Sequence, residues 1–194
     1  GMWQFTQSTG KRFLTVNKFV DERRDPIRAS EAAARLLKHN YARLGDWPMA
    51  VTAYNHGIAG MLRAKEEMGP YEAVFENYEG KRFGFASRNF YSEFLAARHV
   101  AKNYTEYFSD IRVSKSLEAR EVVTKGQTSV AELSRHYEVD LETLRVLNPA
   151  LGQPVFKGQR HVPKGYMLRL PADSAKGIKV SSAALPQIHP DLRQ

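Results

Sequence analysis

The sequence predicts a mainly α-helical domain followed by a small α+β domain with the order strand, helix, helix, strand. Apolar residues recur at three- and four-residue spacing through much of residues 26–103, which is the period of an amphipathic helix. After residue 109 the pattern changes to short β-branched runs separated by capped helical segments. With 194 residues and 42% hydrophobic side chains, the chain can bury the cores of one medium and one small domain.

The first domain is expected to open with a short helix and a loop over residues 1–19, with a break from Thr6 to Gly10. A long helix is then predicted from Pro26 to about Leu44. Asp25 is a favoured N-cap, Pro fits the first helical position, and Gly45 ends the helix. Its apolar positions are Ile27, Ala33, Ala34, Leu37, Tyr41 and Leu44.

Three more helices are predicted in this domain. Asp46 and Pro48 start one that runs to Asn55 and is apolar nearly all round, which is typical of a buried helix. The next covers 59–68, and the last runs from Arg88 to about Asn103 with Ser87 as its cap. The inner side of the last helix is expected to consist of Phe90, Phe94, Leu95, Ala97 and Val100.

The second domain is predicted to begin with a strand at residues 121–124. Thr128 or Ser129 caps the first helix, Asp140 caps the second, and residues 166–170 form the closing strand. The expected division of the chain is a helical domain over 1–112, a linker over 113–119, the small domain over 120–171, and a mobile tail over 172–194, where Ser, Ala, Pro and Lys show no apolar period.

Composition limits the classes of function. The net charge of +8 favours an anionic partner such as nucleic acid, acidic lipid or a polymer bearing carboxylates. The usual aromatic-basic motifs of nucleic-acid-binding modules are missing, so no nucleic-acid partner is predicted. No run approaches the roughly 18 apolar residues of a transmembrane segment. The chain has no cysteine and its histidines lack metal-binding spacing, so neither a metal nor another cofactor is predicted.

Two short stretches form the candidate site, Gly1-Met2-Trp3-Gln4-Phe5 and Ala53-Tyr54-Asn55-His56-Gly57. A cleft for a sugar polymer needs amide groups for the hydroxyl and acetamido groups, and aromatic side chains to line the sugar. Gln4, Tyr54 and Asn55 supply these groups. Each of them alone fits a packing or capping role as well. His56 is interpreted as a loop or core residue, because no paired Ser or carboxylate motif accompanies it.

Together with other segments in the same order, these stretches resemble the lysozyme-like lytic transglycosylases of bacterial cell walls, most closely the membrane-bound type D branch. The resemblance covers about Gly1 to Phe108, through residues 1–5, 8–10, 21–26, 32–34, 47–48, 53–57, 83–91 and 94–97. It implies cleavage of the bond between N-acetylmuramic acid and N-acetylglucosamine without water, giving a 1,6-anhydro product. It also implies a periplasmic or cell-envelope location and peptidoglycan as the partner.

The resemblance further implies that Gln4, Tyr54 and Asn55 hold the substrate and that Thr6 lines the cleft. In this family a single Glu, upstream of the Gly-x-Trp-Gln motif, acts first as acid and then as base. The printed sequence opens on that motif at Gly1, so we expect no catalytic residue within it and no activity from this chain alone. A non-catalytic peptidoglycan-binding protein is the alternative.

Two other carboxylates could in principle replace the expected Glu. Glu22 lies in a run of alternating charges that is interpreted as a solvated ion-pair cluster, and Glu93 lies on a helix beside Ser92. Neither is expected to transfer the proton. The family often has Glu-Thr-Arg-x-Tyr before its last helix, where this chain has Ala86-Ser87-Arg88-Asn89-Phe90, so contacts made by that Glu and Tyr are not expected here.

Residues Arg120 to Pro171 resemble a LysM module. The resemblance implies binding of N-acetylglucosamine-containing chains in a shallow groove between the first turn and the loop after the second helix. The positions that map to the groove are Gly126, Gln127, Thr128, Asn148 and Pro149. Ser129 stands where the pattern usually has Leu, and the loop 151–161 is long. A structural spacer that binds no glycan is therefore the alternative for this domain.

Overall fold

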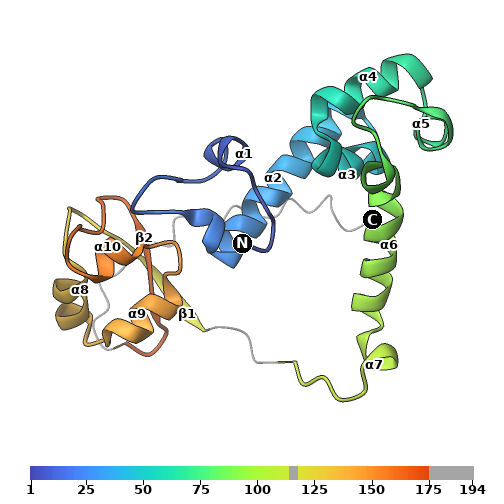
Figure 1. The fold of residues 1–194 in the computed structure, drawn as a ribbon. Coiled ribbons are helices and arrows are strands. Elements are labelled where there is room, and N and C mark those ends of the chain that lie inside the picture. Colours follow the sequence, from blue (N-terminus) through green and yellow to red (C-terminus); the bar gives the residue numbers. More distant parts are fainter. Residues whose placement is uncertain (114–117, 175–194) are drawn as a thin grey trace. The chain divides into compact units, whose positions relative to one another are not determined.

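The structure is a computed structural model that describes residues 1–113 and 118–174 (Figure 1). Its contacts divide the chain into two compact units. The first unit contains residues 1–14 and 26–113, and the second contains residues 15–25 and 118–174. The linker predicted over 113–119 and the tail predicted over 172–194 fall mainly outside the described residues.

The first unit is helical. Its elements are α1 (Gln7–Lys11), α2 (Pro26–Leu44), α3 (Trp47–His56), α4 (Ile58–Met68), α5 (Tyr71–Asn77), α6 (Phe85–Lys102) and α7 (Tyr104–Tyr107). The helices predicted over 26–44, 47–55 and 59–68 are confirmed to within one residue. Gly45 takes the left-handed conformation that ends α2, with φ of 71°, and the Asp46 carboxylate caps α3 by accepting from the backbone N–H of Met49.

Two local predictions about the first unit are wrong. The expected break at Thr6–Gly10 is occupied by α1, because the Thr6 side chain accepts a hydrogen bond from the Thr9 N–H and caps the helix. Ser87 does not cap α6, which begins at Phe85 after Gly84. Ser87 lies buried in the first turn instead, and its hydroxyl donates to the Oδ1 atom of Asn55 at 2.8 Å.

The core of the first unit lies around α3, which packs against α2, α4 and α6. Its buried apolar side chains are Leu44, Met49, Ala53, Met61, Ala64, Val74, Tyr78 and Phe83. The prediction that the apolar side of α6 faces this core is wrong for the second half of the helix. Phe94 is 44% exposed and Leu95 39% exposed, because this half extends beyond α3 (Figure 1). Helical periodicity marks an apolar face but does not show that a partner covers it.

The second unit contains a two-stranded antiparallel sheet formed by β1 (Ala119–Val123) and β2 (Met167–Pro171), in register from Ala119 opposite Pro171 to Val123 opposite Met167. Between the strands lie α8 (Val130–Tyr137), α9 (Leu141–Leu147) and the short α10 (Gln153–Phe156), which the sequence did not predict. The predicted caps are confirmed. Ser129 and Glu132 form a capping box at α8, and Asp140 caps α9.

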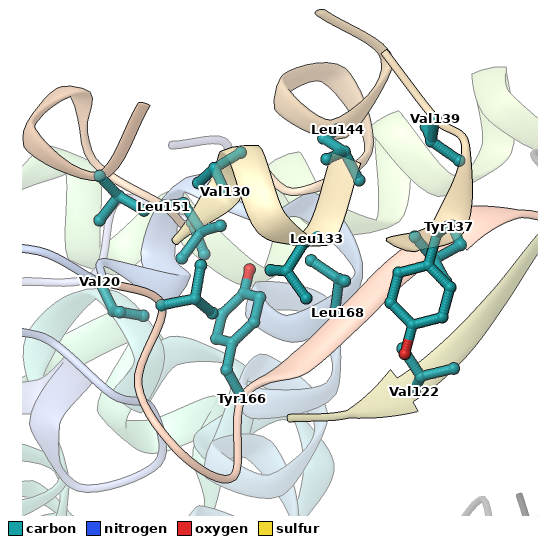
Figure 2. Close-up of a cluster of buried hydrophobic side chains, with 14 residues drawn as sticks. Val20, Val122, Val130, Leu133, Tyr137, Val139, Leu144, Leu151, Tyr166 and Leu168 are labelled. Atoms are coloured by element: carbon teal, nitrogen blue, oxygen red, sulfur yellow. The ribbon is translucent and has the colours of Figure 1, made fainter. Parts of the chain in front are cut away.

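A continuous apolar cluster fills the second unit between the helices and the sheet (Figure 2). It includes Leu133 and Tyr137 from α8, Leu144 from α9 and Leu168 from β2. Val20 belongs to the same cluster and is only 2% exposed, although it lies far away in the sequence. Residues 15–25 are therefore part of the core of this unit.

Backbone hydrogen bonds join residues 15–25 to the loop after α9. The Asp21 N–H donates to the Ala150 carbonyl at 2.8 Å, and the Gly152 N–H donates to the Phe19 carbonyl at 2.7 Å. A Cβ added at position 152 would lie 3.2 Å from the Phe19 carbonyl oxygen, so a larger residue would press against the atom that accepts this hydrogen bond. Through these bonds, residues 15–25 form an extra segment along the edge of the second unit.

A buried ion pair also joins residues 15–25 to the rest of the second unit. The Arg169 Nη1 atom lies 2.6 Å from the Asp25 carboxylate, and its Nε atom lies 3.1 Å from the Glu121 carboxylate. Asp25 is only 3% exposed and Arg169 4%. The interpretation of residues 21–26 as a solvated charge cluster is therefore wrong at Asp25, because only tertiary contacts bring Arg169 to this position.

We predict that Asp25→Ala destabilises the second unit by about 3 kcal/mol, because it leaves the buried Arg169 guanidinium without one of its two carboxylates. Exchange of the β1 and β2 amide hydrogens, followed by mass spectrometry, measures this effect. Glu142→Ala removes the exposed pair with Arg145 and is the matched control, with an expected cost below about 1 kcal/mol. Equal exchange rates in the two variants would contradict the prediction.

Candidate functional site

The two predicted site stretches meet at Tyr54. The Tyr54 hydroxyl, on the last turns of α3, donates to the Trp3 carbonyl oxygen at 2.6 Å. The Tyr54 ring also lies against the rings of Trp3 and Phe5, each with a centroid separation of 6.1 Å, and against Phe90 of α6. Burial raises the pKa of Tyr54, which keeps the phenol protonated as a hydrogen-bond donor.

Gln4 is held in an uncommon backbone conformation, with φ of 48°. This left-handed region costs a non-glycine residue on the order of 1 kcal/mol and is enriched at functional sites. The Gln4 Nε2 atom donates to the Gly1 carbonyl at 2.7 Å and its side chain is exposed. The preceding residue is anchored, because the Trp3 Nε1 atom donates to the Ser30 hydroxyl of α2 at 2.8 Å. The short N-terminal stretch is thus fixed on both α2 and α3.

Asn55 follows Tyr54 at the exposed end of α3. Its Oδ1 atom accepts the hydrogen bond from Ser87, which orients the carboxamide. Within residues 1–113 and 118–174, its Nδ2 atom makes no further hydrogen bond, so it can donate to a ligand. Thr6 has a different position, because its hydroxyl caps α1 and bonds to Ser8 and Thr9. The hydrogen bond between Tyr54 and Trp3 therefore joins the stretch that carries Gln4 to the end of α3, where Tyr54 and Asn55 lie, whereas Thr6 caps its own helix.

Sequence reasoning missed the residues that hold this site in place. Ser87 orients Asn55, and Arg88 donates to the backbone carbonyls of Phe75 and Tyr78, which joins α6 to the end of α5. Both belong to the Ala86–Phe90 stretch where the chain departs from the family pattern. That departure was the available signal, but the sequence favours a cap for Ser87 and predicts no contact for Arg88.

The site as described contains no carboxylate contact. The hydrogen-bond partners of the Gln4, Tyr54 and Asn55 side chains are the Gly1 and Trp3 carbonyls and the Ser87 hydroxyl. Glu22 lies in the second unit, where its carboxylate accepts from the Thr15 N–H at 2.6 Å. Glu93 lies exposed on α6. Neither carboxylate is a hydrogen-bond partner of the Gln4, Tyr54 or Asn55 side chain.

The predicted groove residues of the second unit separate into two groups. Gly126, Gln127 and Thr128 line one pocket of about 670 Å³ together with side chains of α8 and the end of β1. Asn148 is only 1% exposed, and its carboxamide bonds to the backbone N–H and carbonyl of Arg169 in β2. Pro149 is half-buried and does not line the pocket. The Asn148 side chain thus holds the sheet, whereas the first three residues face open space.

Residues 1–113 and 118–174 contain no cluster of three or more His, Asp or Glu side chains arranged to hold a metal ion. In the same ranges, no helix combines the length and the hydrophobicity that crossing a membrane requires. The candidate site is thus described by side-chain amides, a phenol and backbone carbonyls.

Comparison with known proteins finds similarities that include the residues of the first site. Residues 1–73, which include Gln4, Tyr54 and Asn55, match the family model of the transglycosylase SLT domain. The chain is also 26% identical, over 144 residues, to the membrane-bound lytic murein transglycosylase D of Escherichia coli strain K12 and to the protein of the same name from Escherichia coli O6:H1. This match covers 70% of this chain and 30% of each relative.

The chain thus spans about 30% of the length of the curated relatives that it matches. The hydrogen bond between Tyr54 and Trp3 joins two segments within the matched residues 1–73. Both comparisons show a similarity to lytic transglycosylases.

We predict that Tyr54→Phe lowers the free energy of unfolding of the first unit by about 1 kcal/mol, the usual contribution of one hydrogen bond. Urea denaturation followed by tryptophan fluorescence reports on this unit, because Trp3 and Trp47 both lie in it. Tyr107→Phe, at a ring that is 51% exposed, is the matched control and should leave the midpoint unchanged. An unchanged midpoint in both variants would mean that the bond to Trp3 does not hold the two stretches together.

Proposed function

We propose that this chain is part of a peptidoglycan lytic transglycosylase. The proposed reaction cleaves the bond between N-acetylmuramic acid and N-acetylglucosamine and gives a 1,6-anhydro product without consuming water. The observation that carries the proposal is the Tyr54–Trp3 hydrogen bond, which joins the two characteristic stretches inside the residues that match the transglycosylase domain. The relatives' names add the membrane-bound type D branch and a cell-envelope location as finer parts of the proposal.

In this proposal the described site holds the sugar chain. The Asn55 Nδ2 atom donates to a carbonyl or hydroxyl oxygen of the glycan, because Ser87 already occupies the Oδ1 atom. The exposed Gln4 side chain supplies a second amide. Tyr54 acts by fixing Trp3, since its hydroxyl is already used within the protein. Thr6 contributes through the helix that it caps, at the edge of the site.

Proton transfer needs a further group. Departure of the sugar oxygen requires a carboxylic acid at hydrogen-bond distance, and formation of the anhydro ring requires the same carboxylate as base. The hydrogen-bond partners of the Gln4, Tyr54 and Asn55 side chains include no carboxylate, neither Glu22 nor Glu93 among them. We therefore propose that the 194 residues supply the substrate-holding part of the site and are inactive by themselves.

We further propose that the second unit is a LysM module that binds chains containing N-acetylglucosamine. The pocket lined by Gly126, Gln127 and Thr128 supports this, because it combines exposed backbone and amide groups with the rings of His136 and Tyr137. Asn148 contributes indirectly by holding β2. In the alternative function, both units bind peptidoglycan and neither takes part in catalysis.

Incubation of the 194-residue chain with murein sacculi is expected to release no anhydro-muropeptides, as measured by mass spectrometry. The same chain is expected to bind a peptidoglycan tetrasaccharide, detected as a change in Trp3 fluorescence, and Asn55→Ala should weaken this binding about tenfold. Asn103→Ala, at the far end of α6, is the control. Clear turnover would show that the chain does contain a proton-transferring group. Absence of binding would refute the proposed function.

Attachment of a segment that carries the family's Glu ahead of Gly1 distinguishes the two functions. Release of anhydro-muropeptides by the extended chain supports the transglycosylase. Continued binding without release supports the non-catalytic alternative.

For the second unit, Gln127→Ala is expected to weaken binding of chitotetraose by about fivefold, because it removes an exposed amide from the pocket. Gln159→Ala removes an exposed amide outside the pocket and is the matched control. Calorimetric titration of the full chain measures both. Unchanged affinity in Gln127→Ala would favour the structural-spacer interpretation of this unit.

A further inference from the structure

A pocket of the first unit adjoins the candidate substrate residues along the chain. Its volume is about 420 Å³, and it is formed by the end of α3, the start of α4 and the loop between α5 and α6. His56, the residue after Asn55, lines it from α3. The pocket therefore borders the residue that follows Asn55 in α3.

The pocket is lined by cations that have no matching anion. Arg63 comes from α4, Lys81 and Arg82 come from the loop, and no Asp or Glu is among the lining residues. Within the part of the chain that the structure describes, these three side chains make no hydrogen bond or ion pair. Glu79, which precedes Lys81 by two positions, lies 3.4 Å from Arg88 instead. Like charges gathered in one concave site favour an anionic ligand.

Two other cations of the first unit are held by backbone carbonyls. Lys65 donates to the Leu44 carbonyl at 2.6 Å and closes the end of α2. Arg88 donates to the Tyr78 carbonyl at 2.8 Å. The cations of the pocket lack such partners, so the fold does not account for their positions.

The His56 ring, which lines the pocket, is closely packed. The His56 ring packs edge-on against Phe83, with 5.1 Å between the ring centroids. Gly60 allows this position, because an added Cβ would lie 2.4 Å from the His56 Nε2 atom. Burial, and then the positive charge of Arg63, lower the pKa of His56 from its ordinary value of 6.5. An anion bound beside Arg63 would oppose this effect and raise the pKa.

We propose that this pocket binds a free carboxylate of the peptide stem of peptidoglycan while Asn55 and Gln4 hold the sugar chain. The inference rests on the proposed function and adds a second chemical group to the substrate. A volume of about 420 Å³ exceeds the need of a single carboxylate and leaves room for the adjoining part of a peptide. An Arg and two neighbouring basic residues are suited to a carboxylate, since hydrogen bonds to charged groups are stronger than neutral ones.

The test compares three probes by calorimetric titration of the full 194-residue chain. The first is a peptidoglycan tetrasaccharide that carries its peptide stems, the second is the same tetrasaccharide after enzymatic removal of the stems, and the third is inorganic phosphate. Arg63→Gln and the double variant Lys81→Gln/Arg82→Gln remove the pocket's charge. Arg98→Gln and Lys102→Gln, on the exposed half of α6, remove equal charge elsewhere.

We expect each pocket variant to weaken binding of the stem-bearing tetrasaccharide about tenfold and to leave binding of the stem-free glycan within about twofold. The controls should leave both affinities unchanged. In nuclear magnetic resonance titrations, the stem-bearing probe should raise the pKa of His56, and the stem-free glycan should not. This readout separates a carboxylate in the pocket from a general effect of net charge.

Other outcomes have distinct meanings. Equal affinity for both glycans, with unaffected pocket variants, overturns the pocket assignment and leaves the proposed function standing. Phosphate binding as tight as that of the stem-bearing glycan overturns the carboxylate assignment in favour of a phosphate-bearing ligand. Failure to bind either glycan overturns the proposed function and the pocket assignment with it.

Discussion

A buried charge must be matched within the protein, and the Arg169 guanidinium of the second unit is matched by Asp25 and Glu121. Asp25 follows directly on a segment whose Val20 side chain completes the core of the same unit. Residues 15–25 therefore belong to the second unit, although residues on both sides of them in the chain belong to the first. Any account of the small unit as an independent module must include this segment.

The candidate site depends in the same way on specific contacts around α3. Its inner face packs small side chains closely, and its last turn carries three consecutive polar residues in different roles. Tyr54 fixes the N-terminal stretch, Asn55 is oriented by Ser87, and His56 forms the floor of the basic pocket. Gly57, with φ of 88°, ends the helix and allows α4 to begin at once. One helix end thus carries two of the groups proposed to hold the sugar and one side of the proposed peptide subsite.

The net positive charge of the chain indicates a binding surface only after the cations with structural partners are set apart. Arg88 and Lys65 are committed to backbone carbonyls, and Arg169 to buried carboxylates. Arg63, Lys81 and Arg82 surround a pocket without acidic residues. The proposed ligand is a polymer of alternating sugars with acidic peptide stems. Its sugars would meet the amide side chains of the protein, and its carboxylates would meet the cations of the pocket.

Sequence alone determined the features that depend on local chemistry. Pro26 and Gly45 bound α2, and Asp46, Ser129 and Asp140 cap their helices. These predictions succeed because capping and helix termination involve residues a few positions apart. The sugar-binding cleft indicated by the motifs around Gln4 and Tyr54 stays a prediction. Only tertiary structure decided that Ser87 serves Asn55 and that the outer half of α6 is exposed. It also decided that Asp25 is paired with a residue 144 positions away, because periodicity records which residues are apolar or charged and not which partner covers them.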